Sequence, residues 1–129
     1  MTRRLRDGVT ALAAFVLLVG VAGCAARKVY GENTLRIATA VGQDVVIKLA
    51  SNPTTGYDWQ IGGSPDPRIA ALIESDYELP RSPAPGAGGQ RRWTFRAVGP
   101  GTTTIRFDYA RPWERTPPEK STTFTITVQ

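Results

Sequence analysis

The chain has 129 residues, of which 41% are hydrophobic and 21% charged, with a formal net charge of +5 at pH 7. It has one cysteine and no histidine, which excludes Ser-His and Cys-His catalysis, histidine-bound metals and an intrachain disulfide. Its basic residues are scattered, with Arg91-Arg92 the densest pair, so we expect no nucleic-acid binding. With no histidine and no cofactor signature in the sequence, we also expect neither a metal nor a cofactor.

The first 23 residues have the layout of a secretory signal peptide. A basic start at 3–6 is followed by an apolar run from Val9 to Val21 and by small residues before Cys24. The run is shorter than the ~20 residues that span a bilayer comfortably. A small-residue pair directly before a cysteine resembles the bacterial lipobox, in which the cysteine is acylated and becomes the new N-terminus. The alternatives are an uncleaved membrane anchor, or an ordinary cleavage site with an incidental cysteine.

The sequence therefore predicts a lipoprotein signal peptide at 1–23, a lipidated tether at 24–31 and a single domain at 32–129. Two or three acyl chains on Cys24 would hold the protein stably at a membrane, because each buried CH₂ contributes ~0.8 kcal/mol. We expect an exported protein, anchored to a bacterial cell membrane on its outer face or periplasmic side.

From residue 35 onward, apolar and polar residues alternate with period two, which is typical of half-buried β-strands. The residues expected to face the core form six groups: Leu35 and Ile37; Val45, Ile47 and Leu49; Tyr57, Trp59 and Ile61; Trp93, Phe95 and Ala97; Ile105, Phe107 and Tyr109; Phe124, Ile126 and Val128. A seventh segment, 68–79, is either a strand or one helical turn leading into a strand at 76–79. Turns are expected at 62–65 and 99–101, and a mobile loop at 81–89.

Seven short strands separated by such turns predict an all-β, immunoglobulin-like antiparallel β-sandwich with a single domain. In an antiparallel arrangement, every second connection emerges at the same end of the molecule. Connections are also where a rigid scaffold carries binding residues.

Three motifs fall on alternate connections, so we expect them to converge at one end of the sandwich. They are loop 1, loop 2 and loop 3, namely Asn52-Pro53-Thr54-Thr55-Gly56-Tyr57, Gly86-Ala87-Gly88-Gly89 and Arg111-Pro112-Trp113-Glu114.

Each motif also has a plain structural explanation. Loop 1 could be a tight connection, which accounts for Pro53 and Gly56 but not for two threonines at its tip. Loop 2 could be a linker, or could let the backbone approach a partner closely. A tryptophan next to a proline at the end of a strand is hard to bury, and Trp113 with Arg111 nearby is typical of an interface anchor.

In this order and spacing, the motifs resemble the chagasin family of cysteine-peptidase inhibitors, whose loops carry NPTTG followed by an aromatic residue, then GxGG, then RPW or RPF. The flanking residues also match, and the resemblance covers about 34–129. It implies a monomeric, reversible, non-covalent inhibitor of papain-like cysteine peptidases rather than an enzyme. The peptidase-binding residues that it implies are Asn52, Pro53, Thr54, Thr55, Gly56, Tyr57, Gly86, Ala87, Gly88, Gly89, Arg111, Pro112 and Trp113.

By this resemblance, the Thr54-Thr55 tip enters the peptidase groove beside the catalytic cysteine. Loop 2 lies along one side and offers backbone hydrogen bonds in the position of a substrate. Trp113 packs against an aromatic wall on the other side, and Arg111 reaches a polar rim.

Two other functions are compatible with parts of the sequence. A membrane-anchored adhesion or carbohydrate-binding module would use Trp113 and Tyr57 as stacking platforms, but it leaves the threonines and loop 2 unexplained. The pairs Asp76/Glu78 and Asp108/Glu114 have a spacing that could serve a glycosidase-like mechanism, although solvent-facing charges on strands explain them more simply. The sequence does not identify the physiological peptidase.

Overall fold

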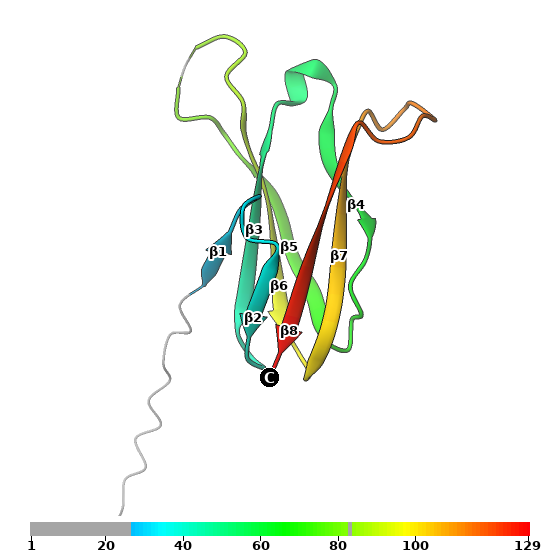
Figure 1. Cartoon of the computed structure of the whole chain (residues 1–129). Coiled ribbons are helices and arrows are strands. Elements are labelled where there is room, and N and C mark those ends of the chain that lie inside the picture. The colour runs from blue at the N-terminus through cyan, green and yellow to red at the C-terminus, as the bar shows by residue number, and fades with distance from the viewer. Residues whose placement is uncertain (1–26, 83) are drawn as a thin grey trace, which may run out of the picture.

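Two sheets pack face to face, because the apolar side chains of each strand gather on one side of it (Figure 1). The computed structural model describes residues 27–82 and 84–129. The first sheet has the order β1 (Lys28–Tyr30), β3 (Asp44–Ser51), β6 (Gly89–Ala97), β5 (Ala70–Glu78). The second has the order β2 (Arg36–Thr39), β8 (Lys120–Val128), β7 (Gly101–Ala110), β4 (Asp58–Gly63). The predicted signal peptide, Cys24 and the start of the tether lie outside the described residues.

The core lies between the two sheets and is centred on aromatic rings. The ring of Trp93 lies 4.3 Å from that of Phe107, which meets Phe124 edge to face at 5.7 Å. Trp59 and Trp93 are 4% and 3% exposed, so the prediction that both point inward is confirmed. The remaining buried residues of this core are Ile37, Val45, Ile47, Leu49, Ala70, Phe95, Ala97, Ile105, Ile126 and Val128.

The predicted β-sandwich is confirmed, but it is neither seven-stranded nor wholly antiparallel. The described residues form eight strands; β1 pairs parallel to β3 and β2 pairs parallel to β8. The chain crosses between the sheets before and after β2, so these two short strands join the edges of different sheets. β1 occupies part of the predicted tether, where three residues are too few to show a period. Leu35, expected in the core, precedes β2 and is exposed.

The ambiguous segment 68–79 combines both expected readings. A single turn forms where the Asp66 carbonyl accepts bonds from the amides of Ile69 and Ala70, each at 3.0 Å. β5 then starts at once and runs to Glu78 with one bulge, well before the expected start at residue 76. The predicted turn at 62–65 is also displaced, because Gly62 and Gly63 belong to β4.

The outer face of the first sheet is covered by ion pairs. Asp44 pairs with Arg96, Lys48 with Glu78, and Asp76 with Arg92. Beneath these long side chains, Val46 and Thr94 are buried although they face away from the core. The Asp76/Glu78 pair is thus part of a salt-bridged surface.

Candidate functional site

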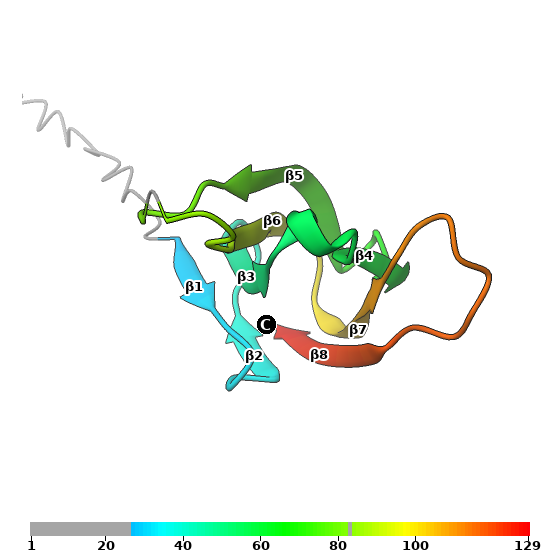
Figure 2. The ribbon, with the colours of Figure 1, turned by 90° about the horizontal axis from the view of Figure 1, so that it is seen from above.

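The three loops lie at one end of the sandwich, as the alternation of strands predicted (Figure 1). Loop 1 joins β3 to β4 and so crosses from one sheet to the other. Loop 2 joins β5 to β6 within the first sheet, and loop 3 joins β7 to β8 within the second. Seen from above, the short helical turn of loop 1 lies between the other two loops (Figure 2).

Loop 1 is closed by its own hydrogen bonds. Pro53–Thr55 form one turn of 3₁₀ helix, capped by Asn52, whose Oδ1 accepts from the Thr54 amide at 3.3 Å and from Thr54 Oγ1 at 2.6 Å. The amide and hydroxyl of Thr55 both donate to the Asn52 carbonyl, at 3.2 and 2.9 Å. The turn ends at Gly56, whose φ of 82° is in the left-handed region that favours glycine. The tip is therefore rigid and presents two exposed threonines.

Loop 3 lies against loop 1 through Trp113. A Cβ placed on Gly56 would come within 2.5 Å of the Trp113 Cη2 atom, so the indole packs where any side chain would stand. Trp113 is nevertheless 68% exposed. The ring is thus held by one edge and presents most of its surface outward.

Arg111 joins the same two loops. Its Nε donates to the Thr55 carbonyl at 3.3 Å, its Nη1 bonds to Glu114 at 3.2 Å, and its guanidinium lies 4.4 Å from the centre of the Tyr57 ring. The sequence prediction assigned Arg111 to a partner's rim. In the free protein it is occupied in holding loop 3 to loop 1.

Tyr57 continues this contact into the core. Its ring stacks on Tyr109 at 5.4 Å, Tyr109 meets Trp59 at 5.1 Å, and Lys120 lies over both of the latter rings. Tyr57 was expected both in the core and at the binding edge, and it lies half-buried between them. With Tyr109 on one face and Arg111 over the ring, Tyr57 is poorly suited to be a sugar-stacking platform.

Loop 2 is joined to loop 1 at its first glycine and to β5 at its last. The Asn52 side-chain amide donates to the Gly86 carbonyl at 3.0 Å. The Gly89 amide donates to the Tyr77 hydroxyl at 2.8 Å, and a Cβ on Gly89 would come within 2.7 Å of that oxygen. Ala87 is half-buried and Gly88 exposed between them. The final glycine is therefore required by close packing.

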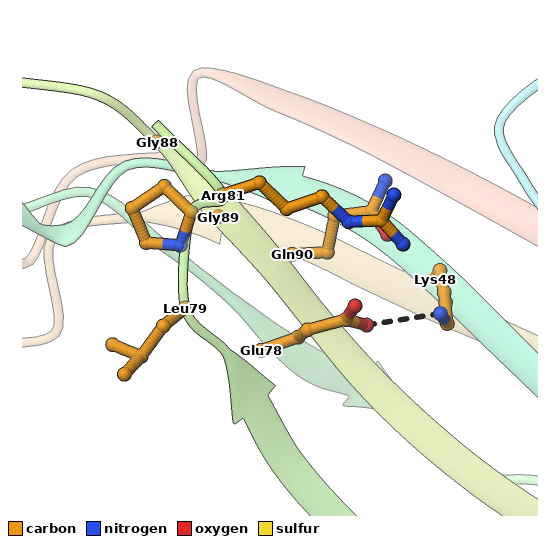
Figure 3. Close-up of a pocket in the computed structure, with 8 residues that line it drawn as sticks. Lys48, Glu78, Leu79, Arg81, Gly88, Gly89 and Gln90 are labelled. Carbon is orange, nitrogen blue, oxygen red and sulfur yellow. Dashed lines mark hydrogen bonds and ion pairs between the residues drawn. The ribbon is translucent and has the colours of Figure 1, made fainter. Parts of the chain in front are cut away.

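A shallow cleft of about 290 Å³ borders loop 2 on its outer side (Figure 3). It is lined by Lys48, Glu78, Arg81 and Gln90 beside Gly88 and Gly89. The ion pair between Lys48 Nζ and Glu78, 2.9 Å long, crosses it. Among its lining residues, Gly88 and Gly89 alone belong to the three motifs, so the cleft adjoins the shared edge only at loop 2.

The sequence prediction missed a polar cluster beneath the loops, formed by Ser51, Asp58, Tyr77 and Arg91. Asp58 Oδ1 accepts from Ser51 Oγ and from the Trp59 amide, each at 2.8 Å, and its other oxygen pairs with Arg91. Partial burial alone raises the pKa of Asp58, but the bonds from Arg91, Ser51 and the Trp59 amide lower it below its ordinary value. The only sequence signal was that Asp58 directly follows loop 1.

The remaining carboxylates offered by the sequence are occupied. Asp108 pairs with Arg106 and accepts a bond from Ser121, while Glu114 pairs with Arg111. Among the described residues, no group of three or more acidic or cysteine side chains could hold a metal ion, and no helix is long and apolar enough to cross a membrane.

A comparison with protein families shows to which family the chain belongs. The model of the chagasin family of peptidase inhibitors, I42, matches residues 38–128, which include all three loops. The chain belongs to the chagasin family. It is 36% identical to chagasin of Trypanosoma cruzi over 99 residues, which cover 74% of this chain and 88% of that protein. Members of this family are peptidase inhibitors and not enzymes, so the chain acts by binding.

Two solved structures share the chagasin-family fold. One is the cysteine protease inhibitor EhICP2 of Entamoeba histolytica, with a TM-score of 0.67 and 24% identity over 80% of this chain and 95% of that one. The other is PbICP-C, solved in complex with falcipain-2, with a TM-score of 0.59 and 19% identity over 80% of this chain and 98% of that one. At these identities the likeness shows the fold alone.

Proposed function

We propose that this chagasin-family inhibitor binds papain-like cysteine peptidases reversibly and occludes the active-site cleft with loops 1, 2 and 3. The observation that carries the proposal is the joining of the loops into one edge. Asn52 bonds loop 1 to loop 2, while Arg111 and Trp113 hold loop 3 against loop 1. The exposed groups on that edge include the Thr54-Thr55 tip and the Trp113 ring.

The arrangement suits a wedge that is formed before binding. Little conformational entropy is lost on association when loops are already ordered, so more of the contact energy appears as affinity. Loop 1 enters the groove with its hydroxyls already bonded to Asn52, loop 2 offers backbone groups, and Trp113 is the anchor. With no free nucleophile on this edge, binding is non-covalent. EhICP2, which has this fold, is described as a cysteine protease inhibitor.

Residues 27–129 without lipid are expected to inhibit papain reversibly, with a Kd of about nanomolar or below, as a rigidly anchored interface of about 1,600 Å² allows. Titration of papain activity measures this. A folded domain that fails to inhibit at about micromolar concentration, or that binds carbohydrate instead, contradicts the proposal.

Between about pH 5.5 and 8, the inhibitor is expected to contribute little to the pH dependence of inhibition, because the chain has no histidine. Folding lowers the pKa of Asp58, so its contribution to stability is complete above the unfolded value of about 3.9. That contribution is lost only as the pH falls below it. A steep change near neutral pH that follows the inhibitor would contradict this.

We also propose that acylation of Cys24 anchors the inhibitor to a bacterial membrane. The course of β1 supports an orientation in which the loops point away from that membrane. Lys28 pairs with Val45, near the start of β3, whereas β3 ends at Ser51 beside loop 1. Five or six residues of β3 separate the start of β1 from loop 1, which at ~3.3 Å for each residue is a distance of about 15–20 Å. An anchor just before β1 would leave the loops accessible.

Cys24→Ser is expected to abolish acylation and to release the protein from the membrane, or to leave its precursor uncleaved, without changing papain inhibition. Cys24 precedes the first strand in the sequence and serves only the proposed anchor, so its substitution is expected to leave the inhibitor domain unchanged. Metabolic acyl labelling and membrane fractionation measure the effect. Unchanged labelling and fractionation would show that the lipobox interpretation is wrong.

A further inference from the structure

Asp58 connects three segments at the end of the sandwich that carries the loops. It is the first residue of β4 in the second sheet, directly after loop 1. Its Oδ1 accepts from the hydroxyl of Ser51, the last residue of β3 in the first sheet, at 2.8 Å. Ser51 and Asp58 flank loop 1, so this bond closes the loop at its base. Ser51 is 3% exposed, and its hydroxyl is shielded from water.

Arg91 extends the connection to loop 2. It lies on β6, two residues after Gly89, and both its Nε and its Nη2 bond to the Asp58 carboxylate. Two-point pairing of this kind fixes orientation as well as distance. The Tyr77 hydroxyl adds a parallel link, because it donates to the Ser51 carbonyl at 3.4 Å and accepts from the Gly89 amide at 2.8 Å. Hydrogen bonds and an ion pair therefore connect the strand ends from which loops 1 and 2 start.

We infer that Asp58 is a positioning residue, which with Arg91 fixes the separation of loops 1 and 2 and holds loop 1 in the form that the peptidase groove accepts. The inference rests on the proposed peptidase inhibition and extends it below the contact surface. Asp58 is not itself at the tip, so it acts through the loops.

The chain offers a matched control one residue along the same strand. Arg92 also pairs with an aspartate through both Nε and Nη2, but its partner Asp76 lies on β5 and the pair covers the outer face of the sheet. Neither residue bonds to a loop segment among the described residues. Loss of either ion pair removes a similar interaction from the fold, but only the Asp58 pair supports the loops.

The experiment compares Asp58→Asn, Arg91→Gln, the double variant and Asp76→Asn in the full chain, purified in mild detergent. Papain inhibition is measured well below each melting temperature, together with hydrogen exchange of the loop 1 and loop 2 amides. Each single variant of the Asp58 pair is expected to weaken inhibition about tenfold, since hydrogen bonds to charged groups are strong. The double variant is expected to lose about the same tenfold rather than a hundredfold, because one interaction is lost in all three.

Faster exchange at Gly56 and Thr54 in Asp58→Asn, with inhibition and exchange in Asp76→Asn close to wild type, supports the inference. Unchanged inhibition by a folded Asp58→Asn chain overturns it, and so does an equal loss in Asp76→Asn, which would indicate a general effect of stability. Should Asp58→Asn fail to fold, Arg91→Gln decides by the same criteria. A wild-type chain that does not inhibit papain overturns the proposed function, and this inference with it.

Discussion

Trp113→Ala is expected to weaken papain inhibition by roughly thirty- to a thousandfold and to leave the melting temperature nearly unchanged. The ring is 68% exposed and packs mainly by one edge on Gly56, so its removal takes little from the core. As a central interface anchor, the same ring accounts for about 2–4 kcal/mol of binding. The inhibition constant and the melting temperature of one preparation measure both effects.

Trp93→Ala is the control with the opposite result. Trp93 is 3% exposed and packs on Phe107, so its truncation is expected to cost about 3–5 kcal/mol of folding free energy. For a domain of this size, that corresponds to a fall of more than about 10 °C in melting temperature. Trp59 is the less clean control, because its ring contacts Tyr109, on which Tyr57 of loop 1 stacks. If Trp113→Ala unfolds the domain as badly as Trp93→Ala, or leaves inhibition intact, loop 3 is not part of the binding edge.

Gly56→Ala is expected to weaken inhibition by about tenfold to a hundredfold. The alanine would stand at a φ of 82°, which costs about 1–2 kcal/mol, and its methyl group would overlap the Trp113 ring at 2.5 Å. Either the loop 1 tip or the indole has to move, and both belong to the proposed contact surface. In the Trp113→Ala background the added loss is expected to be much smaller, because the two changes act on one contact.

Gly42→Ala separates backbone strain from displacement of the ring. Gly42 has a φ of 89° with open space around its Cβ position, and it lies in the turn between β2 and β3, away from the loops. The Gly42→Ala variant is expected to lose about as much stability as Gly56→Ala and to inhibit papain as the wild type does. Equal inhibition by the Gly56 and Gly42 variants would mean that the Trp113 contact with loop 1 does not matter for binding.

The sequence alone determined the strands that form the core and the order of the loops. Alternation with period two is a local property of the sequence. It predicted that Trp59, Trp93 and Phe107 face inward, because successive side chains of a strand point to opposite faces and the apolar face is the one that is buried. The position of the three motifs on alternate connections then required a common end. The exposure of Trp113 followed from its place beside a proline after a strand.

Only the tertiary structure decided how the loops are held. Asp58 and Arg91 lie 33 residues apart and on different sheets, and no local pattern pairs them. Arginine is common in binding interfaces, so the sequence favoured a contact between Arg111 and a partner. The fold instead places Arg111 against loop 1, where it bonds to the Thr55 carbonyl and lies over the Tyr57 ring. The short parallel strands at the sheet edges also depend on a neighbour's backbone. Pairing between distant segments is a property of the packed chain, which is why periodicity and motifs located the binding edge but not the contacts that shape it.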